Sequence, residues 1–96
     1  MVETVEAADE VPKTLPVDGA ILVGTTRYPK WLAFDCPCRT GHRILLNLHK
    51  TRRPYWRVTS TDRLTVRPSV DVRNWDRRCH FIFEHGHAVW FREEGR

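Results

Sequence analysis

The chain lacks the long apolar stretch that a membrane-spanning helix requires. None of its apolar runs approaches the ~20 residues that cross a bilayer. Its first residues are acidic and lack the basic and apolar regions of a secretion signal. We therefore expect a cytoplasmic protein that makes no contact with a membrane.

Cysteine is also scarce, with only three in the chain. Three cysteines cannot all pair within one molecule, and a reducing compartment would keep their thiols free. A disulfide scaffold is therefore not expected, and the thiols remain available to a metal ion.

Helical periodicity and internal repeats are absent, because no stretch shows three apolar turns at helical spacing. Short segments of β-prone or alternating residues occur instead, and each is typical of a strand. The expected strands cover residues 19–24, 30–35, 43–48, 55–59, 64–67, 70–72, 80–84 and 88–91. The sequence predicts a mainly β fold, a small antiparallel sheet or sandwich with a metal-binding knuckle.

Two connections and the tryptophans complete this expectation. Gly86 can take the positive φ of a hairpin turn between the last two strands. Residues 74–78 are expected to form a loop, in which Trp75 could be an exposed anchor. The other three tryptophans, Trp31, Trp56 and Trp90, are expected in the core.

The first eighteen residues differ in composition from the rest. They contain two prolines, no aromatic residue, and five acidic residues against one lysine. This composition predicts a flexible acidic arm over residues 1–18, followed by a small zinc-stapled β domain over residues 19–96. Because the whole chain carries +4 and the arm carries −4, the β domain carries +8.

Arginine supplies thirteen of the sixteen basic residues. Its planar guanidinium forms bidentate pairs with carboxylate or phosphate, so we expect an acidic protein partner. A nucleic acid is the alternative partner, because Arg52, Arg53 and Arg57 lie near Tyr55 and Trp56, which could stack on bases.

Cysteine and histidine occur in a pattern that is typical of a metal site. Cys36 and Cys38 are separated by one proline, and residues i and i+2 of an extended segment share a face. Cys79 and His80 follow in the second half of the chain. Structural zinc sites take four tetrahedral Cys or His ligands, so we predict one zinc ion bound by Cys36, Cys38, Cys79 and His80.

The fourth ligand has an alternative. Cys79 and His80 are neighbours, and neighbouring side chains of a regular strand point to opposite faces. His42 follows Cys38 by four residues and could return to the same ion through a turn at residues 39–41.

Several segments together resemble a family of small bacterial and phage proteins that is carried as a domain of unknown function. They are WLAFDCPC (31–38), GHRILLNL (41–48), PYW (54–56), RPSV (67–70) and CHF (79–81), with Leu64, Gly86 and Trp90. Members are sometimes encoded beside ubiquitin-like conjugation genes of antiviral operons. The resemblance implies a metal-binding accessory protein whose Cys/His positions are matched by Cys36, Cys38, Cys79 and His80, and it implies no known reaction. Relatives often place two residues between the later Cys and His, whereas Cys79 and His80 are adjacent here. The assignment of His80 as a metal ligand therefore stays open.

The sequence shows no complete catalytic arrangement, and we assign no catalytic residue. A metal-binding interaction module with an arginine-rich surface is therefore the preferred function, and a nucleic-acid-binding module is the alternative. An enzyme ranks below both, since it would need a metal-activated water with His85 or His87 moving protons, and both flank the glycine of an expected hairpin.

Overall fold

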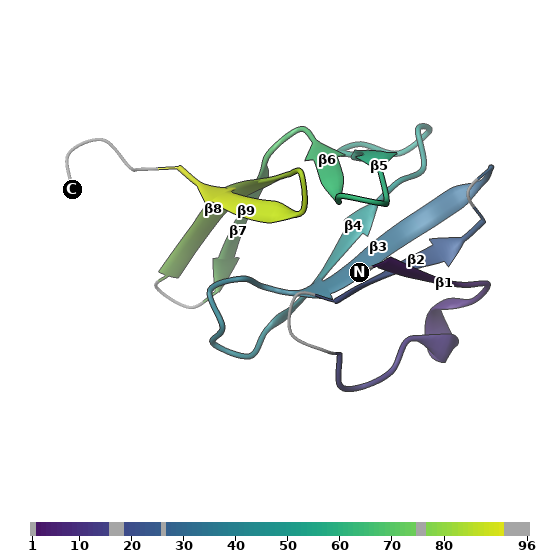
Figure 1. Cartoon of the computed structure of the whole chain (residues 1–96), viewed down its shortest axis with the longest axis horizontal. Coiled ribbons are helices and arrows are strands. Elements are labelled where there is room, and N and C mark those ends of the chain that lie inside the picture. Colours follow the sequence, from purple (N-terminus) through teal and green to yellow (C-terminus); the bar gives the residue numbers. More distant parts are fainter. Residues whose placement is uncertain (1, 16–18, 26, 75–76, 92–96) are drawn as a thin grey trace.

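The computed structural model describes residues 2–15, 19–25, 27–74 and 77–91, with residues 74 and 77 described for the backbone alone (Figure 1). Within these residues it contains nine strands and one 3-10 helix, η1. The elements are β1 (Val2–Val5), η1 (Ala8–Glu10), β2 (Ala20–Gly24), β3 (Pro29–Asp35), β4 (Arg43–Asn47), β5 (Arg57–Ser60), β6 (Thr65–Arg67), β7 (Val70–Asn74), β8 (Arg77–Glu84) and β9 (His87–Trp90).

The strands form three sheets. The first has the order β1-β2-β3-β4, the second is the β5-β6 pair, and the third has the order β7-β8-β9. Strand β1 runs parallel to β2, and the other described pairs are antiparallel. Figure 1 shows the first and third sheets on opposite sides of β5 and β6.

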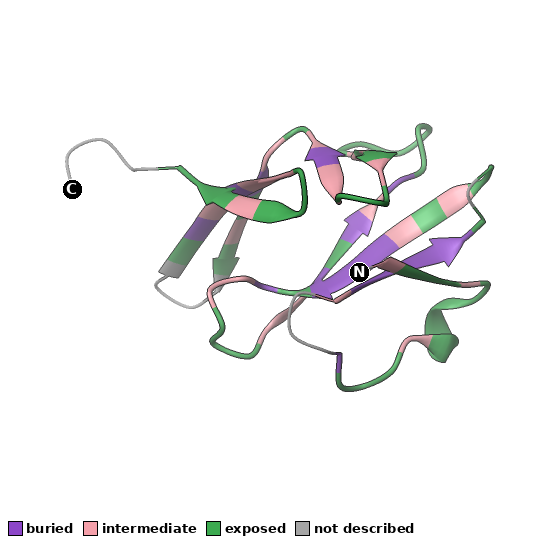
Figure 2. Cartoon of the chain, in the orientation of Figure 1, coloured by how far each residue is buried: buried purple, intermediate pink, exposed green. Residues whose placement is uncertain are grey.

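The first sheet buries side chains on both faces. In β2, Ala20 and Leu22 pack into the main core, whereas Ile21 and Val23 face a second apolar cluster. Alternation along a strand sends successive side chains to opposite faces, so a continuous apolar run suits a strand covered on both sides. Figure 2 shows the resulting buried stretch along β2 and β3.

The N-terminal segment covers the second of these faces. Leu15 is buried there, and β1 pairs with β2. The Arg43 guanidinium donates hydrogen bonds to the carbonyl oxygens of Pro12 (2.7 Å) and Lys13 (2.9 Å). The segment expected as a flexible arm thus contacts the first sheet through β1, Leu15 and the carbonyls of Pro12 and Lys13, and the domain division at residue 18 stays a prediction.

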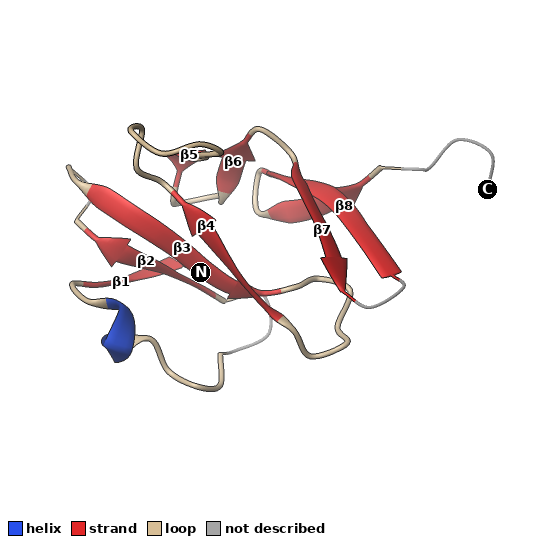
Figure 3. Ribbon diagram, turned by 180° about the vertical axis from the view of Figure 1, so that it is seen from behind, coloured by secondary structure: helices blue, strands red, loops and turns tan. Residues whose placement is uncertain are grey.

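The third sheet packs one face onto the main core. Val70, Cys79 and Phe81 point inward and are almost fully buried. The ring of Phe81 lies edge-on to Phe34 of β3, with centroids 6.1 Å apart. Since neighbours alternate, Asp71 and His80 lie on the outer face, directly opposite each other in the β7–β8 register. Figure 3 shows β7 and β8 side by side.

The predicted fold class is confirmed, because the described chain is nearly all strand and its sheets are mainly antiparallel. Gly86 has a φ of +85° in the turn between β8 and β9, as expected. The loop expected at 74–78 is shorter, since β7 continues to residue 74 and β8 begins at residue 77. The anchor proposed at Trp75 lies outside the described residues.

Two further expectations concern the burial of the tryptophans and the lack of a membrane-spanning helix. Trp31 and Trp56 pack against apolar clusters as expected. Trp90, which was also expected in the core, is 46% exposed on β9, and its ring lies 5.3 Å from that of Phe81 between centroids. Among the described residues there is no helix long and apolar enough to cross a membrane.

Candidate functional site

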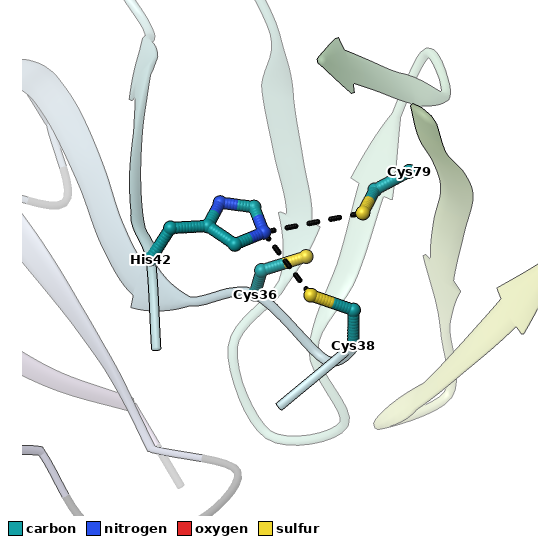
Figure 4. A group of neighbouring side chains, drawn as sticks. All are labelled: Cys36, Cys38, His42 and Cys79. Atoms are coloured by element: carbon teal, nitrogen blue, oxygen red, sulfur yellow. Dashed lines mark hydrogen bonds between the residues drawn. The ribbon is translucent and has the colours of Figure 1, made fainter. Parts of the chain in front are cut away.

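Three cysteines and one histidine meet where the first and third sheets join. Cys36, Cys38 and His42 belong to the turn between β3 and β4, and Cys79 comes from β8 (Figure 4). Their sulfur and nitrogen atoms all lie within 4.8 Å of one another. Two chain segments more than thirty-five residues apart thus supply one compact donor group.

The β3–β4 turn doubles back on itself to bring His42 into this group. The backbone N–H of Cys36 donates to the carbonyl of His42 (2.9 Å), and that of Arg39 donates to the carbonyl of Cys36 (3.0 Å). Arg39 and Gly41 both have positive φ, of 61° and 93°, in this turn, which reverses the chain between the antiparallel strands β3 and β4. His42 Nε2 consequently lies 3.1 Å from Cys38 Sγ and 3.9 Å from Cys79 Sγ.

The thiols of this group differ in acidity. Burial raises the pKa of Cys36 to about 12. Burial also opposes ionisation of Cys38, but hydrogen bonds from the side chain and backbone of Thr40, from Cys36 and from His42 lower its pKa to about 6. Cys38 is therefore mainly a thiolate at neutral pH, whereas Cys36 keeps its proton until a cation displaces it.

The donor set fits a tetrahedral zinc ion. Zn–S bonds of about 2.3 Å place tetrahedral sulfur donors roughly 3.8 Å apart, and the four donor atoms lie within 4.8 Å of one another. Three sulfurs and one nitrogen are a common structural set, and soft thiolates select zinc over magnesium or calcium. Cys36 and Cys79 are buried, so the set lies within the core.

The structure does not bring His80 into this donor group, although the sequence favoured it as the fourth ligand. Cys79 and His80 are consecutive residues of the regular strand β8, so they face opposite sides of the third sheet. The alternative residue, His42, lies beside the sulfur atoms instead. The structure thus groups His42, and not His80, with the three cysteines.

His80 instead meets a serine on the outer face of the third sheet. Its Nε2 lies 3.2 Å from the hydroxyl oxygen of Ser69, the residue that precedes β7. The His80 ring stacks on Phe91 at 4.4 Å between centroids, and the Phe91 N–H donates to the His80 carbonyl (3.0 Å). On the other side, the Trp56 indole N–H donates to the Ser69 carbonyl (3.1 Å). Both members of the pair are held in place by their neighbours.

A carboxylate lies across the strand pair from His80. Asp71 is the register partner of His80, and the Arg78 Nε–H donates to its carboxylate (2.8 Å). The hydrogen bond from Arg78 lowers the pKa of Asp71, which is therefore ionised at neutral pH. Asp71 thus sets a negative charge directly opposite His80 in the strand register.

Sequence reasoning missed Ser69. The signal was present, because Ser69 lies in RPSV and His80 in CHF, two segments that carry the family resemblance. The pairing itself depends on the β7–β8 register, which no spacing rule gives. His85 and His87, the groups considered for proton transfer, are exposed at the hairpin turn, as expected for turn residues.

The described geometry is that of a small β domain with a cysteine-rich donor group on its inner side and a serine–histidine pair on its outer side. Residues 7–91 match a family model described as bacterial ubiquitination-like system serine protease (BubE), and the chain belongs to this family. The ubiquitination-like system agrees with the operon association implied by the resemblance. No curated protein and no solved structure matches the chain.

Proposed function

We propose that the protein is a serine hydrolase of a bacterial ubiquitination-like system, with Ser69 as nucleophile and His80 as general base. The observation that carries this proposal is the 3.2 Å separation of Ser69 Oγ and His80 Nε2. It is supported by the family description, which names a serine protease. A nucleophile and base within hydrogen-bond reach are the minimum such chemistry needs.

The pair can carry out acyl transfer in two steps. As His80 Nε2 takes the hydroxyl proton, Ser69 Oγ forms a bond to the substrate carbonyl carbon, and the leaving group departs with that proton. Water then attacks the acyl-serine ester and loses a proton to His80, which returns that proton to Ser69 Oγ as the ester bond breaks. This step releases the carboxylic acid and regenerates the serine. Asp71 stabilises the imidazolium that forms in both steps, because its charge lies directly across the strand pair.

The site also has the access that a substrate needs. Ser69 and His80 are half-buried rather than enclosed, and Pro68 beside them is exposed. Phe91 covers one face of the His80 ring and limits its rotation. A peptide or an isopeptide-linked chain could therefore reach Ser69 without opening the core.

We further propose that Cys36, Cys38, His42 and Cys79 hold one structural zinc ion. Four protein donors would fill a tetrahedral ion, leaving no position for a reactive water. When bound, the ion supplies a cross-link between the β3–β4 turn and β8. This cross-link would fix the strand that carries His80, even though His80 itself faces away from the metal.

An active-site-directed fluorophosphonate probe tests the hydrolase proposal. The chain has two serines, Ser69 and Ser60, so Ser60→Ala is a matched control. We expect mass spectrometry of the intact protein to show one adduct, lost in Ser69→Ala, strongly slowed in His80→Gln and retained in Ser60→Ala. An adduct that persists in Ser69→Ala, or no adduct on well-folded protein, would contradict the proposal.

A further inference from the structure

A groove lined by arginines opens beside Ser69. It encloses about 590 Å³ and is lined by Arg53, Pro54, Tyr55, Arg57, Arg67 and Pro68, which we call the arginine groove. Arg67 and Pro68 immediately precede Ser69 in the chain. Because consecutive Cα atoms are about 3.8 Å apart, the groove begins within one residue of the nucleophile.

Two of its arginines are placed directly opposite each other. Arg57 of β5 and Arg67 of β6 are register partners, and like charges in this position destabilise a strand pair. Glu84 neutralises Arg67 through an ion pair of 2.9 Å. Among the residues that the structure describes, no carboxylate lies within ion-pair distance of Arg53 or Arg57. The groove therefore holds positive charge that the described chain does not balance.

The loop before β5 holds the groove wall in shape. Asn47 Nδ2 lies within hydrogen-bond distance of the carbonyls of His49 (3.2 Å), Arg52 (3.1 Å) and Pro54 (3.1 Å). The Trp56 N–H donates to the Asn47 carbonyl (2.8 Å), which closes the loop. The groove is thus built before any ligand arrives.

We propose that the arginine groove binds a carboxylate side chain of the substrate, on a residue next to the bond that Ser69 attacks. The inference rests on the proposed function and names its substrate class, an acidic segment of polypeptide. The planar guanidinium forms bidentate hydrogen bonds with carboxylates, so Arg57 and Arg53 can both engage one Glu or Asp. Binding would also balance the charge of Arg57, which no carboxylate of the described residues neutralises.

A polypeptide fits the groove better than a nucleic acid does. Arg53 lies over the Tyr55 ring at 5.7 Å and covers one face on which a base would stack. Glu84 already neutralises Arg67 through its ion pair, so the groove offers too few unbalanced arginines for the row of phosphates on a nucleic acid strand. A single carboxylate side chain needs only the unbalanced arginines.

The first test measures hydrolysis of matched fluorogenic peptides that carry Glu, Gln or Lys beside the scissile bond. We expect kcat/KM to be roughly tenfold higher for the Glu peptide than for the Gln peptide, in line with a charge-assisted pair. This preference should arise from a lower KM, with similar kcat for the two peptides. Arg57→Gln should bring this ratio close to one, and Arg57→Glu should favour the Lys peptide. Arg27→Gln is the control, because Arg27 lies over Tyr28 at the same 5.7 Å but outside the groove.

The second test measures binding without turnover, by fluorescence anisotropy of the Glu peptide on the full-length Ser69→Ala variant. Affinity that falls with added Arg57→Gln supports the groove even if Ser69 proves not to be the nucleophile. Turnover that requires Ser69 but shows no preference for Glu overturns the groove and leaves the hydrolase intact. A single-stranded oligonucleotide that binds more tightly than the Glu peptide also overturns it.

Discussion

The first and third sheets are held together by different forces. The first sheet is apolar on both faces, with Leu22 and Leu32 in the main core and Ile21 and Ala33 in the second cluster. The third sheet has one apolar face, and its other face carries His80 and the rest of the proposed catalytic site. The catalytic groups thus lie on the sheet that has less apolar packing of its own.

The smaller apolar packing of the third sheet suggests what the proposed zinc site contributes to the fold. Cys79 and Phe81 are the buried residues among those of β8 that the structure describes, and Phe83 packs against the same core. Cys79 is also a proposed zinc ligand. Hydrophobic burial is worth about 1.5–3 kcal/mol for a large side chain, whereas structural zinc contributes about 10 kcal/mol or more in apparent binding free energy. The comparison predicts that the first sheet depends on packing and the third on the ion.

Removal of the metal should have the largest effect. Native protein should contain one zinc per chain by elemental analysis, and chelation should abolish its cooperative thermal transition, because the ion outweighs the burial energy of so small a domain. Fluorophosphonate labelling of Ser69 should disappear at the same time. An unchanged melting curve after complete removal of zinc would end the idea that the third sheet depends on the ion.

Replacement of His42 should have the next largest effect on stability, since it removes one of the four proposed zinc donors. His42→Ala should lower zinc affinity and the melting temperature, whereas His80→Ala should keep both and lose only the labelling of Ser69. The two variants are matched, because each replaces one half-buried imidazole. Zinc loss in His80→Ala with retention in His42→Ala would reverse the assignment drawn from the β8 strand.

Truncation of Phe81, the buried aromatic residue of β8, tests whether the first and third sheets lose stability independently. Phe81→Ala should cost about 3–5 kcal/mol of stability and also reduce Ser69 labelling, because Phe81 neighbours His80. Ile21→Ala should cost about 2–4 kcal/mol but leave labelling intact below its melting temperature. Equal loss of labelling in both variants would show that the two sheets unfold as one unit.

The smallest loss of stability should come from replacing Asp71, on the outer face of the third sheet. Arg78 lowers the pKa of Asp71 in the folded protein, so the charged carboxylate stabilises the fold at neutral pH, and this contribution is lost as pH falls through the lowered pKa. Since the Asp71 side chain is 43% exposed, the effect should be under about 1 kcal/mol. The melting temperature of Asp71→Asn should lie slightly below that of the native protein at pH 7, and the gap should close in acid. A gap that widens in acid would contradict the ion pair.

The sequence predicted the strands well, because period-two patterns such as Ile44, Leu46 and Leu48 report the buried face directly. It also identified the three cysteines that the structure brings together. The choice of histidine depended on the chain reversal at Arg39 and Gly41, which is set by backbone angles rather than by spacing.

Two other features could not be read from local patterns. The pairing of Ser69 with His80 arises from the register of β7 and β8, a property of the assembled sheet. In the N-terminal segment, Val5, Val11 and Leu15 lie in the second apolar cluster, a packing that the acidic composition of residues 1–18 does not indicate. The composition of a segment describes its average polarity, whereas its packing depends on the positions of a few apolar side chains.

The amide of Asn47 has a consequence for how the protein ages. Deamidation would replace its NH₂ group with a carboxylate oxygen and set a negative charge against the carbonyls of His49, Arg52 and Pro54. That reaction begins when the following backbone nitrogen attacks the side chain, and the nitrogen of Leu48 is engaged with the Lys30 carbonyl at 2.9 Å. The hydrogen bond of Leu48 therefore protects the loop that the Asn47 amide shapes from slow chemical damage during storage.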